Sequence, residues 1–128
     1  MPNNGSKTGL HGFIIDCQIG PGADDLDAAA RFWSEALRLP LNPQADSGDA
    51  GYRHLAAGPG GLDIEIQKVD HPSRVHLDIQ AEDVAAEVKR LEDLGATVFK
   101  QVQTWVVMEA PTGHRFCVVP AKDRPLPE

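Results

Sequence analysis

The chain has 128 residues, 41% of them hydrophobic and 24% charged, so we expect one domain with a hydrophobic core of its own. Its formal net charge of -7 argues against nucleic acid and anionic membrane surfaces as partners. There is no apolar run of signal-peptide or membrane-spanning length, so the expected location is the cytoplasm. The two cysteines, Cys17 and Cys117, lie too far apart in the sequence for a C-x-x-C metal or redox pair.

The first half of the chain predicts one strand, one helix and further strands. Apolar residues alternate over 12–18, which indicates a strand. Residues 24–39 have helical periodicity, begin with acidic residues and are followed by Pro40, which ends the helix. The apolar stripe of this helix consists of Leu26, Ala29, Ala30, Phe32, Trp33, Ala36 and Leu37. Strands are then expected near 51–57 and 62–69, joined by a turn at the GPGG of residues 58–61.

The same order begins again at residue 74. A strand at 74–80 precedes a helix at 81–95, and strands follow at 97–102, 105–110 and 114–120. The apolar stripe of this second helix consists of Val84, Val88, Leu91 and Leu94. We therefore predict an α+β fold of two strand–helix–strand–strand–strand modules. Module one would cover about 11–70 and module two about 74–120 of a single domain at 11–120, between a flexible N-terminus at 1–10 and a tail at 121–128.

Alternation along the strands divides each sheet into two faces. One helix per module can cover only one face, so the apolar positions are predicted to face the helices. These positions are Phe13, Ile15, Cys17, Leu62, Ile64, Ile66, Val75, Leu77, Ile79, Phe116 and Val118. The opposite face carries Ile14, Asp16, Gln18, Asp63, Glu65, Gln67, His76, Asp78, Gln80, Arg115, Cys117 and Val119. This face is either an ordinary solvated sheet surface or, as its polar residues on four strands favour, the lining of a cleft between curved sheets.

Several residues of the polar face are candidates for a functional site. His76 could act as an acid or base near neutral pH, with Asp78 or Asp16 holding its imidazole, or it could be a structural histidine. Trp105 could stack on a flat ligand, or it could pack in a core or an interface. The residues expected to contact a substrate in the cleft are Gln67, Gln80, Trp105 and Arg115.

The other histidines and aromatic residues have structural interpretations. Trp33 and Cys17 are expected on the helix side, in the core. His54, His71 and His114 have no paired ligand nearby in the sequence, so we expect them at the surface.

The sequence resembles the glyoxalase-like branch of the vicinal oxygen chelate superfamily. The resemblance is carried by FIIDC, ARFWSEALRLPL, RVHLDIQAEDVAAEVKRLEDLGATV and WVVMEAPTGHRFCVV, which together span about residues 11–120. It implies two βαβββ modules around a cleft, a small-molecule ligand and often a homodimer. Members of the superfamily include glyoxalase I, extradiol dioxygenases, epimerases, fosfomycin-modifying enzymes and metal-free bleomycin-binding resistance proteins.

The resemblance also implies a metal site, which this sequence matches only in part. Metal-dependent members take one ligand, often His, from the first strand of each module and a Glu from the last strand. His76 and Glu65 occupy two such positions, whereas Gly12 or Ile14 stands at the third and Cys117 replaces the second Glu. Glu65, His76 and Cys117 would together suit one divalent ion, Zn, Ni, Fe or Mn; otherwise the protein binds no cofactor.

Two functions are consistent with these features. The first is a cytoplasmic glyoxalase-like lyase, isomerase or hydratase for an oxygenated metabolite, with His76 as acid, base or ligand. Its supporting carboxylates would be Glu65, Asp16 and Asp78. The alternative is a non-catalytic protein that sequesters a drug or metabolite, as bleomycin-resistance proteins do. The altered ligand positions favour the alternative, because sequestration needs only a shaped cleft.

Overall fold

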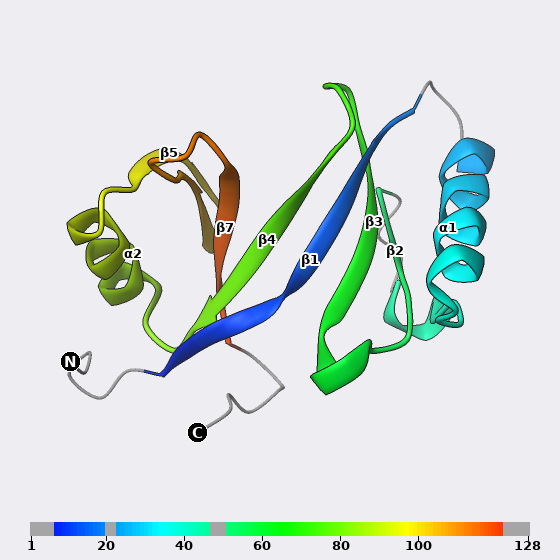
Figure 1. The fold of residues 1–128 in the computed structure, drawn as a ribbon, viewed down its shortest axis with the longest axis horizontal. Coiled ribbons are helices and arrows are strands. Elements are labelled where there is room, and N and C mark those ends of the chain that lie inside the picture. The colour runs from blue at the N-terminus through cyan, green and yellow to red at the C-terminus, as the bar shows by residue number, and fades with distance from the viewer. Residues whose placement is uncertain (1–6, 20–22, 47–50, 122–128) are drawn as a thin grey trace. The chain divides into compact units, whose positions relative to one another are not determined.

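A computed structural model describes residues 7–19, 23–46 and 51–121 (Figure 1). The fold is α+β, as predicted. The elements are β1 (Thr8–Gln18), α1 (Ala23–Leu37), β2 (Tyr52–His54), β3 (Asp63–Val69), β4 (Arg74–Ala81), α2 (Val84–Asp93), β5 (Thr97–Val102), β6 (Trp105–Glu109) and β7 (Arg115–Pro120). The residues 1–6 of the expected N-terminal segment, and the expected tail from residue 122 on, lie outside the described residues. Neither described helix has the length and apolar character that crossing a membrane requires.

The chain divides into two compact units. The N-terminal unit is Gly12–Val75, and the C-terminal unit combines Met1–His11 with His76–Glu128. In the N-terminal unit the strand order is β2-β3-β1, with β3 antiparallel to β2 and parallel to β1. In the C-terminal unit the order is β4-β7-β6-β5, with β4 parallel to β7 and the remaining neighbours antiparallel.

The N-terminal unit has fewer strands after its helix than the sequence predicted. Within the described residues, α1 is followed by β2 and β3, while Leu41 forms only an isolated antiparallel bridge to Leu55. Pro40 and Pro43 flank that bridge. Because proline has no backbone N–H to donate to a neighbouring strand, the pairing at Leu41 cannot extend into a regular ladder. The C-terminal unit has the predicted order of strand, helix and three strands.

The core of the N-terminal unit lies between α1 and one face of its strands. Its buried members are Ile15, Leu26, Leu55, Ile64 and Ile66, with Phe13, Cys17, Ile19, Ala29, Trp33 and Leu39 packed partly buried against them. Trp33 and Cys17 therefore lie on the helix side, as predicted, but both are only partly buried. The predicted helix stripe was too wide, since Phe32 is 61% and Leu37 39% exposed and Ala36 also lies at the surface. The stripe residues that pack in this core are Leu26, Ala29 and Trp33.

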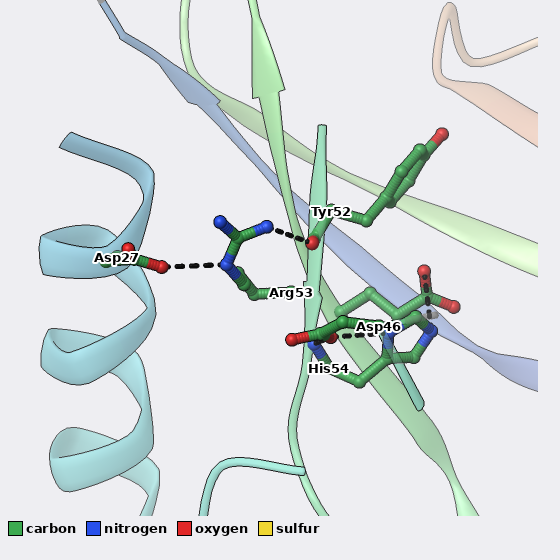
Figure 2. Close-up of polar contacts among 6 residues, drawn as sticks. Asp27, Asp46, Tyr52, Arg53 and His54 are labelled. Carbon is green, nitrogen blue, oxygen red and sulfur yellow. Dashed lines mark hydrogen bonds and ion pairs between the residues drawn. The ribbon is translucent and has the colours of Figure 1, made fainter. Parts of the chain in front are cut away.

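An ion pair joins α1 to the edge strand of the same unit (Figure 2). Arg53 on β2 donates from Nε to Oδ1 of Asp27 at 2.7 Å, and its Nη1 donates to the carbonyl oxygen of Tyr52 at 2.8 Å. Figure 2 shows Arg53 directed toward α1 and His54 directed away from the helix. This arrangement follows from the alternation of successive side chains along a strand.

The core of the C-terminal unit lies between α2 and its strands, as expected. It contains Ala81, Leu91, Ala96, Val106, Met108, Phe116 and Val118, and Ile79, Val84, Val88 and Ala110 pack against it. Three predicted core positions were wrong: Leu94 is 66%, Val75 56% and Leu77 50% exposed. Leu94 lies at the C-cap, beyond the last helical residue. The other two occupy the first half of β4, whereas α2 packs against β5, β6 and β7.

Local signals explain where α2 begins and ends. The side chain of Asp83 caps the N-terminus by accepting from the backbone N–H of Ala86 at 3.0 Å. Gly95, with φ 111°, follows the helix in a conformation that only glycine adopts readily. On the buried face of the helix, Glu87 accepts two hydrogen bonds from the guanidinium of Arg90, at 2.8 and 2.7 Å. This contact with Glu87 raises the pKa of Arg90.

Candidate functional site

The C-terminal unit brings three of the predicted site residues together. Asp78 on β4 lies opposite Cys117 on β7 in the parallel ladder, and His76 precedes Asp78 by two positions on the same face of β4. One donor atom each from His76, Asp78 and Cys117 can be chosen so that all three lie within 4.8 Å of one another. We name these three residues the C-terminal cluster. The imidazole Nε2 of His76 is 3.7 Å from Oδ1 of Asp78, and the two side chains are only 15% and 11% exposed.

The N-terminal unit contains a second cluster, which the sequence analysis did not identify. His54 on β2 pairs directly with Glu65 on β3, and Asp63 precedes Glu65 by two positions on the same face. Donor atoms of His54, Asp63 and Glu65 also lie within 4.8 Å of one another. We name these residues the N-terminal cluster. The expectation that His54 lies at the surface was wrong: its side chain is 20% exposed and its Nε2 is 3.3 Å from Oε1 of Glu65.

Asp46 holds the other side of the His54 ring. Its Oδ1 accepts from the backbone N–H of His54 at 2.8 Å and lies 3.1 Å from the ring Nδ1 (Figure 2). Asp46 directly follows the short 3-10 helix Pro43–Ala45, and its backbone N–H closes that turn on the carbonyl of Pro43. The imidazole is therefore fixed through both of its nitrogens, by carboxylates from two different segments.

These contacts shift the pKa of both partners on β2 and β3. The hydrogen bond with Glu65 raises the pKa of His54 to about 9, although burial works in the opposite direction. Burial, with a contribution from Asp63, raises the pKa of Glu65 to about 7, while His54 works against this rise. The two shifts oppose each other, because an ionised Glu65 favours the His54 cation and a protonated one does not. Asp46 supplies a second carboxylate, so we take the His54 cation to be the favoured form at neutral pH.

The remaining acidic candidate and one cleft candidate lie in the N-terminal unit. Asp16 on β1 is 2% exposed, and its Oδ2 is 3.9 Å from Nε of Arg74. Gln67 pairs with Asp16 in the parallel ladder and with Tyr52 in the antiparallel one. Ile14, also buried, is the β1 neighbour of Glu65, so no ligand comes from that position. At Gly12 a Cβ would overlap the carbonyl oxygen of Asp63.

The other cleft candidates lie in the C-terminal unit. Gln80 is 5% exposed and pairs with Val119 on β7. Arg115 donates from Nε to Oε1 of Glu109 at 2.9 Å, and its guanidinium lies 3.5 Å from the ring centroid of Phe99. Trp105 is half-buried at the start of β6. The predicted metal set of Glu65, His76 and Cys117 draws its members from both units and stays a prediction, as do the roles expected for Asp16 and Asp78.

The hairpin between β2 and β3 contained the signal for the missed histidine. The turn at Pro59–Gly61 connects the two strands, and the pairs Tyr52–Gln67 and His54–Glu65 are symmetric about the GPGG segment. Extending the pairing outward from that turn places residue 54 opposite residue 65. Asp46 could not have been found in this way, because it reaches His54 from an irregular segment.

Comparison with known proteins gives the same family as the sequence resemblance. The model of the family described as "Glyoxalase-like domain" matches residues 14–119. No curated protein sequence matches this chain.

Solved structures with a similar fold share little sequence identity with this chain. Hypothetical protein BH1468 from Bacillus halodurans superposes with a TM-score of 0.62 at 10% identity, over 94% of this chain and 99% of that one. A methylmalonyl-CoA epimerase in complex with methylmalonyl-CoA and NH4+ has a TM-score of 0.57 at 15% identity, over 92% and 97%. A Mn(II)-bound glyoxalase from Novosphingobium aromaticivorans has a TM-score of 0.54 at 17% identity, over 92% of this chain and 42% of that one.

The family model covers most of the chain, and the folds of the epimerase and the glyoxalase agree with it. The chain therefore belongs to the glyoxalase-like domain family of the vicinal oxygen chelate superfamily.

Proposed function

We propose that this protein binds a small oxygenated metabolite at the polar face of its strands and acts on it as a lyase, isomerase or hydratase. The observation that carries this proposal is the C-terminal cluster, in which His76, Asp78 and Cys117 converge from two neighbouring strands. Two similar structures are an epimerase and a glyoxalase, which supports this reaction class by analogy. The expected homodimer and cytoplasmic location stay predictions.

The donors of the C-terminal cluster fit a divalent metal ion. An imidazole nitrogen, a carboxylate oxygen and a thiolate sulfur are all ligands that zinc accepts, and three protein ligands leave a position open for a substrate. His76, Asp78 and Cys117 would hold the ion, and a ligand role of Glu65 stays a prediction. When bound, such an ion supplies a Lewis acid that stabilises negative charge on substrate oxygen atoms.

His76 would carry the proton transfer in this site. Its ring is mostly withdrawn from water, with Nε2 3.7 Å from a carboxylate oxygen of Asp78. Asp78 would hold the ring in place and stabilise it when it is charged, so that the imidazole can take up or give a proton. If His76 serves as a metal ligand instead, a carboxylate would carry the proton transfer, and Glu65 and Asp16 stay the predicted candidates.

The sequestering function remains the second candidate, on one specific observation. The family position on the first strand of the N-terminal unit offers no ligand, because Gly12 lies against the backbone of Asp63 and Ile14 is 3% exposed beside Glu65. A protein that only holds its ligand does not require that donor.

Metal analysis, ligand binding and turnover can be measured on the same preparations. Protein purified without chelator is compared with His76→Ala, Glu65→Ala and, as a control at an exposed turn, His114→Ala. Oxygenated metabolites are screened by thermal shift, and each hit is tested for turnover and for solvent-deuterium exchange by NMR. We expect His76→Ala to lower kcat/KM by about 100-fold or more, the usual size of an acid–base contribution. Ligand binding without turnover or exchange would establish sequestration instead, and the absence of any ligand would overturn both.

A further inference from the structure

The N-terminal cluster is assembled by the β2–β3 hairpin alone. Alternation puts Asp63 and Glu65 on the face of β3 that turns away from α1, and antiparallel pairing sets His54 beside Glu65. All three donor atoms lie within 4.8 Å of one another. None of these residues belongs to the C-terminal cluster, and only Glu65 is also among the residues that the proposed function uses.

The spacing of two donors already suits a metal ion. Nε2 of His54 and Oε1 of Glu65 are 3.3 Å apart. In a tetrahedral zinc site with bonds of about 2.0–2.1 Å, neighbouring ligand atoms are separated by about 3.3 Å. An ion could therefore take the place of the hydrogen bond between these atoms without moving them apart. The side chains of His54 and Glu65 are 20% and 15% exposed, so the site is partly shielded from water but open to an entering ion.

Asp46 sets the form of the ring that a metal requires. In the neutral tautomer that carries its proton on Nδ1, this N–H is directed to Asp46, whose Oδ1 lies 3.1 Å from Nδ1. The lone pair is then on Nε2, which faces Glu65. Histidine ligands in metal sites almost always donate their second ring N–H to a carboxylate, a backbone carbonyl or water in this way. Asp46 also accepts from the backbone N–H of His54 at 2.8 Å, and this second contact fixes the position of the carboxylate beside the ring (Figure 2).

We propose that His54, Asp63 and Glu65 form a binding site for a divalent transition-metal cation, with Asp46 as the positioning residue of His54. The donors are one nitrogen and two carboxylate oxygens, a set suited to Mn, Fe, Co or Zn. Two carboxylates and a neutral imidazole balance the charge of the ion. This site shares only Glu65 with the ligand set that the family pattern predicts.

The test uses the full chain with Cys117→Ser, so that the thiol of the C-terminal cluster cannot contribute. Metal-stripped protein is titrated with Co²⁺, and binding is followed by calorimetry and by the ligand-field absorption of the bound ion. We expect one equivalent to bind, and His54→Ala in this background to lower the affinity by about 100-fold or more, since losing even an outer carboxylate costs about 10- to 100-fold. His71→Ala, which removes the histidine of the β3–β4 turn, is the matched control and should leave the affinity unchanged.

Asp46→Asn tests the positioning role separately. We expect the Co²⁺ affinity to fall by about 10- to 100-fold and the ligand-field spectrum to change, because the ring is no longer held for coordination through Nε2. A purely structural Asp46 would leave the spectrum of the saturated protein unchanged. No Co²⁺ binding by the Cys117→Ser protein, or equal affinity in His54→Ala with circular dichroism as for the parent, would overturn the site and leave an ion pair only. Turnover in His54→Ala would show that the proposed function stands without this site.

Discussion

The two units place a histidine and a carboxylate on the face that turns away from their helix, but they complete the set differently. In the N-terminal cluster, antiparallel pairing brings His54 against Glu65 and strand alternation adds Asp63. In the C-terminal cluster, His76 and Asp78 share one strand and parallel pairing adds Cys117. Alternation therefore supplies two donors in each case, and the neighbouring strand decides the third. The donor atoms of the N-terminal cluster are therefore nitrogen and oxygen, whereas those of the C-terminal cluster include sulfur.

The largest effects are expected from breaking the core of either unit. Ile66 and Met108 are both 0% exposed, one in each core. Replacing either one by Ala removes buried methyl groups and leaves a cavity, so we expect each variant to lose about 2–5 kcal/mol of unfolding free energy. Chemical denaturation followed by circular dichroism measures the loss. If the variants unfold at the same midpoint as the parent, the core assignment of that unit is contradicted.

The chemical difference between the clusters predicts a difference in metal preference. Thiolate ligands favour Zn²⁺ over Mn²⁺, whereas carboxylates accept both. In a His54→Ala background, Cys117→Ser should weaken Zn²⁺ binding by about 100-fold or more, because the loss of a ligand costs at least as much as the loss of an outer partner. Mn²⁺ binding by the parent should be unaffected by the same change. Competition titrations measure both affinities, and Cys17→Ser, which removes the thiol on the helix side, is the control.

The ion pairs of the two helices differ in burial, and this difference should be measurable. Arg90→Ala leaves the carboxylate of Glu87, 1% exposed, without its guanidinium partner, so we expect a loss of about 1–3 kcal/mol. Arg53→Ala breaks a pair whose Asp27 side chain is 45% exposed, and we expect about 1 kcal/mol or less. Urea denaturation of both variants gives the comparison. Equal losses would mean that burial of the carboxylate does not decide the cost.

An effect of about the same size as the loss in Arg53→Ala is expected from the pH dependence of the N-terminal cluster in metal-free protein. The folded-state pKa of His54 is raised from 6.5 to about 9, so its stabilisation is complete below pH 6.5 and lost as the pH rises through 9. Glu65, with its pKa raised from 4.5 to about 7, changes stability in the same direction over a lower range. Because part of the His54 side chain is exposed to water, we expect its titration to change the unfolding free energy by only about 1 kcal/mol.

This effect is isolated by measuring the unfolding free energies of the parent and its variants in buffers at pH 6, 7.5 and 9. The parent protein should lose stability across this range more steeply than His54→Gln. His71→Gln should follow the parent. If the unfolding free energies of the parent and of His54→Gln depend equally on pH, the His54 ring does not change its protonation on unfolding.

Much of the fold could be predicted, because periodicity reports directly on strands and helices. The strand at 97–102 was predicted to the residue, and the second helix was placed within a few residues. The errors concerned how far the buried faces of the elements extend and not whether an element is a helix or a strand. Val75 and Leu77 have the right parity for the core but are 56% and 50% exposed, because alternation does not report how far along a strand the helix cover extends.

Less of the candidate site could be predicted. His76, Asp78 and Cys117, which alternation placed on the polar face, do come together. His54 was missed because its partners come from strand pairing and from Asp46 in an irregular segment, neither of which has a periodic signal. The family pattern pairs Glu65 with His76 as metal ligands, whereas within its own unit Glu65 contacts His54.

The tight contact between β1 and β3 determines how this protein could be redesigned. Any side chain at residue 12 would collide with the backbone of Asp63, so the ligand that relatives supply from this strand cannot be grafted there. Position 14 is different, because it pairs with Glu65 and the backbone there already accommodates the isoleucine side chain. An engineer who wants to build a metal site into this scaffold should therefore begin with Ile14→His and leave the glycine untouched.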